Sequence, residues 1–246
     1  MWLLLMLGPL LFLQRALHRE IQSIFLLLFR RMDVALVLFA LLFFPGVLLH
    51  EGSHYLMALI LRVPTGRFSL IPQRLGDGRV RMGYVETGQT DYLRDALIGV
   101  APLLSGGVFV AYVGLVRWQL QNIWVAFHQA GWSGILETLV ATTQKADFWL
   151  WFYLMLAISS TMLPSVSDRR AWLPVLLILI GLGVLALILG AGDWMRLYLA
   201  PRLNDGLRAM AVIFAISAAV HLLAWLPLTL LHRAWARLIG LQVVSA

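Results

Sequence analysis

Residues 34–61 read VALVLFALLFFPGVLLHEGSHYLMALIL, an apolar run that carries a cluster of ionisable side chains in its second half. A transmembrane helix needs about 20 mainly apolar residues, and this run is long enough. His50, Glu51 and His54 lie inside it. An ionisable group at mid-bilayer costs about 2.5–3.5 kcal/mol on insertion scales, so such groups are functional candidates by default. The run therefore predicts a membrane helix with a site inside it.

The segment His50-Glu51-Gly52-Ser53-His54 has the spacing of a zinc-binding helix. Residues i and i+4 share one helix face, so both imidazoles can reach one ion. Glu51 lies beside the first ligand, where it can accept a proton from water at the metal. We expect one Zn²⁺ per chain, with His50 and His54 as ligands and Glu51 as the catalytic base. A polar helix-packing patch and a pair of haem-ligating histidines are the alternatives.

A third ligand must come from elsewhere, because a catalytic zinc takes three protein ligands and keeps one open position. Asp168 is the best candidate, since it follows an apolar run that Pro164 would break and re-aim. Asp168 could instead only end that span. Three other residues stay open as ligands: His221, His128 and Glu137.

Composition indicates that lipid is the solvent for most of this chain. Its 246 residues are 61% hydrophobic and 13% charged, whereas soluble domains are about 25% charged. The net charge is +7, but the arginines gather at the ends of apolar runs, where they suit anionic headgroups. We expect the lipid bilayer and no nucleic acid as a partner. Without cysteine, disulfides and thiolate ligands are excluded.

The hydropathy pattern predicts an all-α polytopic membrane protein of about six transmembrane helices. Residues 14–33 are mixed and suit an interfacial amphipathic helix that could also extend the first span. Residues 117–147 carry Trp118, Trp124 and Trp132 and suit a second interfacial segment. The expected spans are residues 1–13 (a short one), 34–61, 96–116, 148–163, 172–191 and 209–231.

A small β-hairpin is expected in the polar loop 62–95 after the zinc helix. Residues 67–71 and 79–86 alternate in polarity, with Gly76-Asp77-Gly78 between them. With residues 14–33 set aside, the side that holds this loop has ten basic residues and the other side five. The positive-inside rule then favours a cytoplasmic hairpin. We expect a multi-pass protein of a prokaryotic cytoplasmic membrane.

These residues resemble the site-2 protease family of intramembrane zinc metalloproteases. Residues 47–58, VLLHEGSHYLMA, are similar to the family's zinc helix, and the loop 62–95 resembles its β-region. Residues 100–106, VAPLLSG, are similar to its Ala-Gly-Pro-type stretch. Met162-Leu163-Pro164 through Asp168 resembles its Asn-x-x-Pro…Leu-Asp-Gly motif, with Thr161 where the family has Asn. The likeness covers roughly residues 34–170.

The resemblance implies a three-helix catalytic core over residues 34–170, preceded by 1–33 and followed by two helices in 171–246. It also implies a metal below the membrane surface and hydrolysis of a peptide bond within or near a transmembrane segment of a protein substrate. The cytoplasmic hairpin predicted from the charge balance puts the active site nearer the cytoplasmic side. Ser160 or Thr161 could stabilise the transition state in place of the absent Asn. An edge of the hairpin between Arg67 and Glu86 could hold an unwound substrate by strand addition. The rival functions are an inactive zinc-binding scaffold of the same fold and a haem-carrying electron carrier.

Overall fold

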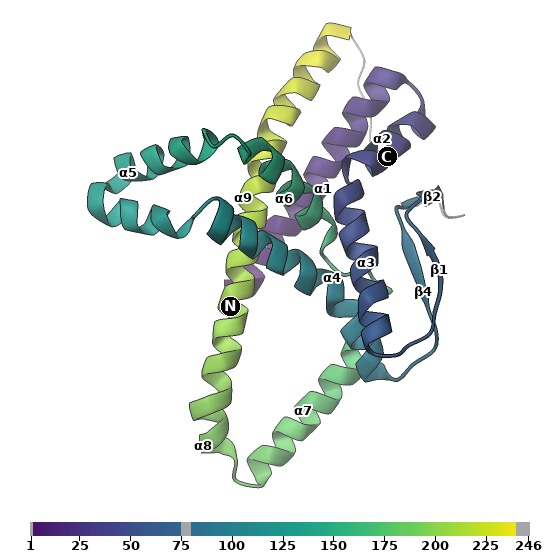
Figure 1. The fold of residues 1–246 in the computed structure, drawn as a ribbon, viewed down its shortest axis with the longest axis vertical. Helices are drawn as coiled ribbons and strands as arrows, with labels where there is room; N and C mark the ends of the chain where they lie inside the picture. The colour runs from purple at the N-terminus through teal and green to yellow at the C-terminus, as the bar shows by residue number, and fades with distance from the viewer. Residues whose placement is uncertain (1, 75–79, 240–246) are drawn as a thin grey trace.

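The computed structural model describes residues 2–74 and 80–239, which are mostly helical (Figure 1). Four short strands lie between the third and fourth helices, and two π-helical turns adjoin the longer helices. The helices are α1 (Trp2–Phe29), α2 (Met32–Leu42), α3 (Phe44–Ile60), α4 (Tyr92–Tyr112), α5 (Gln121–Thr143), α6 (Phe148–Thr161), α7 (Trp172–Ile188), α8 (Gly192–Trp194) and α9 (Ala200–Ile239), with π-turns η1 (Val113–Arg117) and η2 (Met195–Leu199).

Helices α3, α4 and α6 pack on one another, and α1 pairs with α9 alongside α6. Apolar side chains from α1, α4, α6 and α9 form one buried cluster that includes Leu10, Val110, Met155 and Phe214. A second buried cluster joins α1, α2, α6 and α9. Helices α4 and α6 are therefore packed against α1 and α9.

The run 34–61 forms two helices rather than the single helix that its hydropathy predicts. The axes of α2 and α3 differ by 67° across a short break. Phe43 stands at the break and is buried, and Pro45 lies in the first turn of α3. Proline has no N–H and is tolerated there, where that donor has no helical partner. The expected zinc helix is thus α3 alone.

Residues 2–29 form one continuous helix, so the expected short span 1–13 and the interfacial segment are not separate elements. Residues 14–29 extend the first helix, which was the alternative for this segment. The chain turns at Arg30, whose φ is 52°. Buried residues recur on one side of α1 along most of its length, because that side packs on α9.

Two described helical segments are long and apolar enough to cross a membrane, Tyr92–Arg117 and Gly192–Leu238. The bent pair α2 and α3 would make a third. The six expected spans are not shown, because α6 and α7 are shorter apolar helices and α1 carries polar residues in its middle. The described part of the chain is compatible with a membrane protein.

The expected hairpin is present beside α3 (Figure 1). Strand β1 (Thr65–Ser69) pairs antiparallel with β4 (Tyr84–Thr87), and β2 (Gln73–Arg74) with β3 (Val80–Arg81). Strand β1 begins two residues earlier than expected, and the second expected stretch is divided into β3 and β4 because the pairing is interrupted between the two ladders. The expected turn at 76–78 lies outside the described residues.

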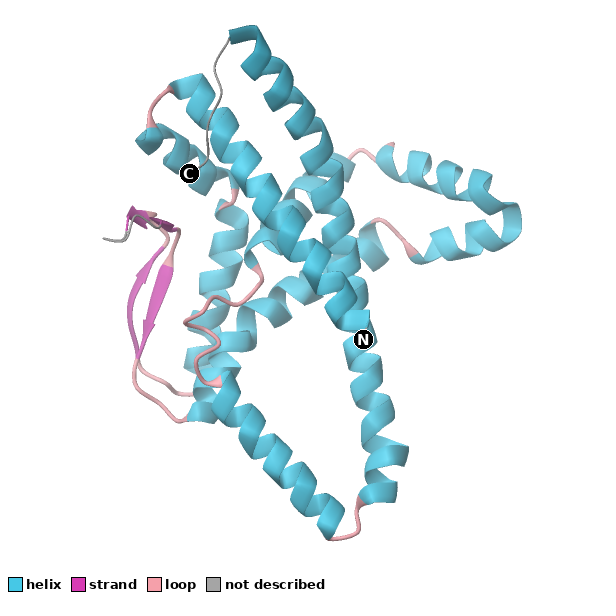
Figure 2. Ribbon diagram, turned by 180° about the vertical axis from the view of Figure 1, so that it is seen from behind, coloured by secondary structure: helices cyan, strands magenta, loops and turns pink. Residues whose placement is uncertain are grey.

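The segment 117–147 is only partly a surface element. Figure 2 shows α5 standing away from the other helices as a helical hairpin, which bends at Gly131 with a φ of 61°. Trp124 and Trp132 are exposed on it, as expected of an interfacial segment. Trp118 is instead buried, with its ring stacked on Phe148, so its expected interfacial place is wrong.

Candidate metal centre

Helix α3 brings His50 and His54 together one turn apart. Their Nε2 atoms are 3.2 Å from each other. His50 Nε2 lies 3.8 Å from the Asp168 carboxylate, and His54 Nε2 lies 3.5 Å from it. The three predicted ligands therefore meet at one point, and within residues 2–74 and 80–239 they are the group of three that can hold a metal ion.

Hydrogen bonds of the two Nδ1 atoms determine that the Nε2 atoms of His50 and His54 face Asp168. His50 Nδ1 is 2.6 Å from the carbonyl oxygen of Thr161, and His54 Nδ1 is 2.8 Å from that of Ile98. A carbonyl oxygen only accepts hydrogen bonds, so each Nδ1 carries the ring proton and donates it. In the neutral rings both Nε2 lone pairs then point at each other and at a carboxylate.

This arrangement fits a zinc ion. Three electron-rich atoms at these distances repel one another unless a cation lies between them. Ligands bound about 2.0–2.2 Å from a tetrahedral zinc lie about 3.3–3.6 Å apart, close to the separations found here. Two imidazoles and a carboxylate are also ligands that zinc accepts, and each histidine has the outer hydrogen bond typical of metal-bound histidines.

Both orienting carbonyls are ones that their own helices leave unused. Thr161 is the last residue of α6, so its carbonyl has no helical partner. Ile98 lies four residues before Pro102 in α4, and proline has no N–H to donate to it. The end of α6 thus supplies the acceptor that orients His50. The proline in α4 leaves free the acceptor that orients His54.

Asp168 reaches the site from the segment between α6 and α7. Its carboxylate accepts a hydrogen bond of 2.7 Å from the N–H of Ser165. Burial raises the pKa of Asp168, but hydrogen bonds from His54 and Ser165 outweigh burial and hold that pKa below its ordinary value. The His54 bond requires a proton on Nε2, so a proton and a metal ion compete for the same place.

Two contacts to α4 hold this segment. The backbone of Asp168 lies so close to Gly99 that a Cβ there would collide with the Asp168 carbonyl. Arg170 forms a two-pronged pair with Asp95 at 2.7 and 2.9 Å. These contacts bring the third ligand down onto the helix that also orients His54.

Glu51 is buried under the hairpin. The residue is 9% exposed, and a Cβ added at Gly83 would stand 2.9 Å from Glu51 Cγ. The aromatic rings of Tyr55 and Phe68 also meet, with centroids 5.8 Å apart. The hairpin therefore covers the face of α3 that carries Glu51.

Comparison with known proteins leaves the family open. No family model, curated protein or solved structure matches this chain. The resemblance to the site-2 protease family stays a prediction, and what the geometry supports is a group of three residues that can hold a metal ion.

The other predicted site residues have different partners. The Ser160 hydroxyl is 2.9 Å from His221 Nε2, and the Thr161 hydroxyl donates to carbonyls of its own helix. Their expected role in the transition state stays a prediction, although neither hydroxyl is left without a partner. His221 is bound in this way and is not among the three converging ligands. The ring of His128 makes edge-on contacts with the rings of Trp124 and Phe127 on the α5 hairpin, and Glu137 lies on the same helix.

Sequence reasoning missed four residues that build the site: Ile98, Gly99, Asp95 and Arg170. A proline four positions after Ile98 was the available signal for the free carbonyl. Nothing in one sequence marks Gly99 or pairs Asp95 with Arg170, because both relations depend on how α4 meets the 162–171 segment.

We expect Pro102→Ala to weaken metal binding. The new N–H would draw the Ile98 carbonyl into the helix and away from His54, and loss of an outer-shell partner costs about 10–100-fold in metal affinity. Zinc affinity measured against a chelator tests this. Pro227→Ala, which restores an N–H within α9, is the control and should leave affinity unchanged. Equal effects of both variants would contradict the role of the Ile98 carbonyl.

Gly99→Ala should displace Asp168, since its methyl group meets backbone that must move. We expect at least about a tenfold loss of metal affinity, comparable to loss of an outer-shell partner. Gly107→Ala on the same helix is the matched control, because its methyl would meet Ile213 at an ordinary 3.5 Å. Unchanged affinity in Gly99→Ala would show that the close contact does not set the position of Asp168.

Proposed function

We propose that this chain is an intramembrane zinc metalloprotease that hydrolyses a peptide bond within or near a transmembrane segment of a protein substrate. The observation that carries the proposal is the convergence of His50, His54 and Asp168 beside Glu51. A purely structural zinc site has four protein ligands and needs no adjacent glutamate. Three ligands and a buried glutamate are instead the composition of a hydrolytic site.

His50, His54 and Asp168 would hold the zinc ion. When bound, zinc supplies a Lewis acid that polarises a carbonyl and lowers the pKa of water. Glu51 follows His50 directly on α3, so it accepts a proton from the attacking water and passes it to the leaving amine. The two carboxylates, Asp168 and Glu51, balance the charge of a divalent ion, which suits a site of low dielectric.

The hairpin is the proposed substrate-binding element. It covers Glu51, and β1 and β4 form a sheet of only two strands. A transmembrane helix must unwind before its carbonyl groups become accessible, and strand addition supplies partners for its backbone. We propose that the unwound segment binds along the hairpin edge between Arg67 and Glu86.

The proposal includes a multi-pass chain in a prokaryotic cytoplasmic membrane, with the site nearer the cytoplasmic side. The support is the excess of basic residues on the side of the hairpin loop. The apolar helices of the described region are compatible with this arrangement.

Metal content tests the proposal without a known substrate. We expect about one zinc per chain in detergent-purified protein, lost on His54→Ala and on Asp168→Ala because each removes a ligand. Glu51→Gln should retain zinc but lose at least about 100-fold in turnover, since it removes the proton acceptor. Turnover is read from a panel of single-span proteins, tagged at both ends and co-reconstituted in vesicles.

Each result separates the alternatives. Protein without zinc, even after supplementation, would remove the basis of the proposal. Zinc retained in Asp168→Ala would move the third ligand elsewhere. Wild type that binds zinc but has the activity of Glu51→Gln would favour the inactive scaffold, and a Soret band would favour the haem protein.

Gly83→Ala should slow cleavage without loss of zinc. Its methyl group would stand 2.9 Å from Glu51 and 3.0 Å from Val47, so the hairpin must lift away from α3. A displacement of about 1 Å at a reacting centre can cost on the order of 100-fold in rate. Gly88→Ala is the control, since its nearest contact, Pro64, is 3.3 Å away and outside the site. Equal cleavage rates of Gly83→Ala and wild type would show that the position of the hairpin on α3 does not affect the reaction.

A further inference from the structure

A polar cluster, buried except for the partly exposed Gln14, joins the end of α6 to α1 and α9. It consists of Gln14 on α1, Ser160 on α6, and Ser217 and His221 on α9. His221 is completely buried, and Ser160 is nearly so. Polar groups are costly to bury in an apolar bundle, so a fully partnered cluster fixes its members relative to one another.

The hydrogen bonds of the cluster all have a defined direction. His221 Nδ1 is 2.7 Å from the carbonyl of Ser217, so Nδ1 carries the proton. His221 Nε2 then accepts from the hydroxyl of Ser160 at 2.9 Å. The side-chain amide of Gln14 donates to the carbonyl of Ser160. Ser160 is therefore held through its side chain by α9 and through its backbone by α1.

The residue after Ser160 orients a predicted metal ligand. The carbonyl of Thr161 accepts from His50 Nδ1, and the same carbonyl ends α6. Helix ends fray readily, because their last carbonyls have no helical partner. An acceptor at a frayed end would not hold an imidazole in one orientation. Fixing Ser160 from two neighbouring helices removes that freedom.

We propose that Gln14 and His221 are positioning residues for the metal centre, acting through Ser160 and the Thr161 carbonyl on His50. This inference rests on the proposed metal site and not on the proposed proteolysis. It gives α1 and α9, which contribute no ligand, a defined part in the site. It also gives a role to His221, which is buried but is not one of the three predicted metal ligands.

The test uses cobalt(II) alone as the probe, on full-length protein in detergent. Its visible absorption spectrum reports the geometry of the ligands, and chelator competition gives its affinity. Gln14→Leu and His221→Ala should each weaken cobalt binding by about 3- to 10-fold, less than loss of a direct outer-shell partner. Both should also alter the visible bands, because the His50 ring is no longer held in one orientation.

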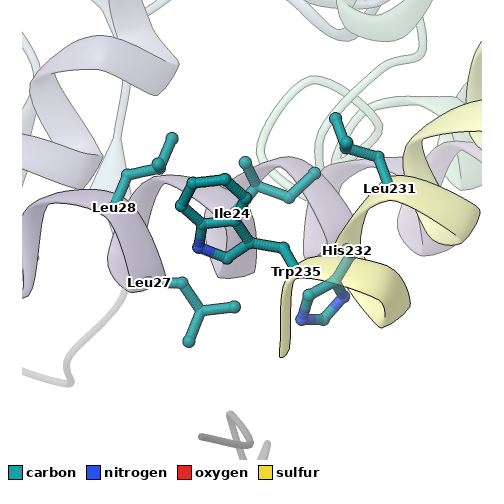
Figure 3. Close-up of a pocket in the computed structure, with 6 residues that line it drawn as sticks. All are labelled: Ile24, Leu27, Leu28, Leu231, His232 and Trp235. Carbon is teal, nitrogen blue, oxygen red and sulfur yellow. The ribbon is translucent and has the colours of Figure 1, made fainter. Parts of the chain in front are cut away.

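Two further variants separate positioning from general loss of stability. His221→Gln keeps an acceptor for Ser160 and should restore much of the cobalt spectrum. Leu27→Ala shortens an apolar side chain that lines a cavity of about 160 Å³ between α1 and α9 (Figure 3). Leu27 lies 13 residues after Gln14 on α1, away from the polar cluster. This substitution should lower thermal stability but leave the cobalt spectrum unchanged. In Gln14→Leu/His221→Ala the losses should not add, because both bonds hold the same residue.

Unchanged cobalt affinity and bands in Gln14→Leu and His221→Ala would overturn the proposal while leaving the metal centre intact. A spectral change in Leu27→Ala equal to that in His221→Ala would also overturn it, since the effect would then be one of packing. Cobalt binding without proteolysis would overturn the protease and leave the positioning role standing. Wild type that binds no cobalt would overturn both.

Discussion

The approach of two imidazole nitrogens and a carboxylate to within 3.8 Å is the constraint on which the rest of this structure depends. Without a metal ion or a proton between them these atoms repel one another, and the apolar surroundings strengthen the repulsion. The fold must therefore fix the orientation of each group through a second contact as well as bring the three groups together. Most of the unusual local features of α3, α4 and α6 can be understood as ways of doing so.

Backbone carbonyls fix the orientation of both histidines. A side-chain acceptor in the same place would bring its own rotational freedom, whereas a carbonyl is as rigid as the helix that carries it. Such a carbonyl is available only where a helix stops or where a proline interrupts its hydrogen bonds. Thr161 and Ile98 meet these two conditions. Gly46 in the first turn of α3 then lets this helix approach α6 closely enough for the His50 bond to form, since a Cβ there would collide with the Ala157 carbonyl oxygen.

How far the sequence predicts this site depends on the range of each interaction. His50, Glu51 and His54 are four residues apart at most, so helical geometry alone brings them together. Asp168 was predicted from the pattern around Pro164, and the structure brings it to the histidines. The partners of Ser160 could not be predicted, because Gln14 and His221 are joined to it only by the packing of α1 and α9 against α6. The same limit explains why the burial of Trp118 was missed: hydropathy reports how much of a segment is apolar but not which neighbours it meets.

The use of carbonyls has a consequence for how such a protein changes over evolutionary time. The contribution of Ile98 and Thr161 to the metal ligands comes from atoms that every amino acid possesses. The metal ligands therefore place no demand on these side chains, and it is the packing of Ile98 against Ala58 and Val63 that limits what its position accepts, so an alignment of relatives would show apolar residues there rather than a signature of the metal site. The positions that such a comparison would reveal are the proline and the glycine beside them, whose value lies in the groups that they lack.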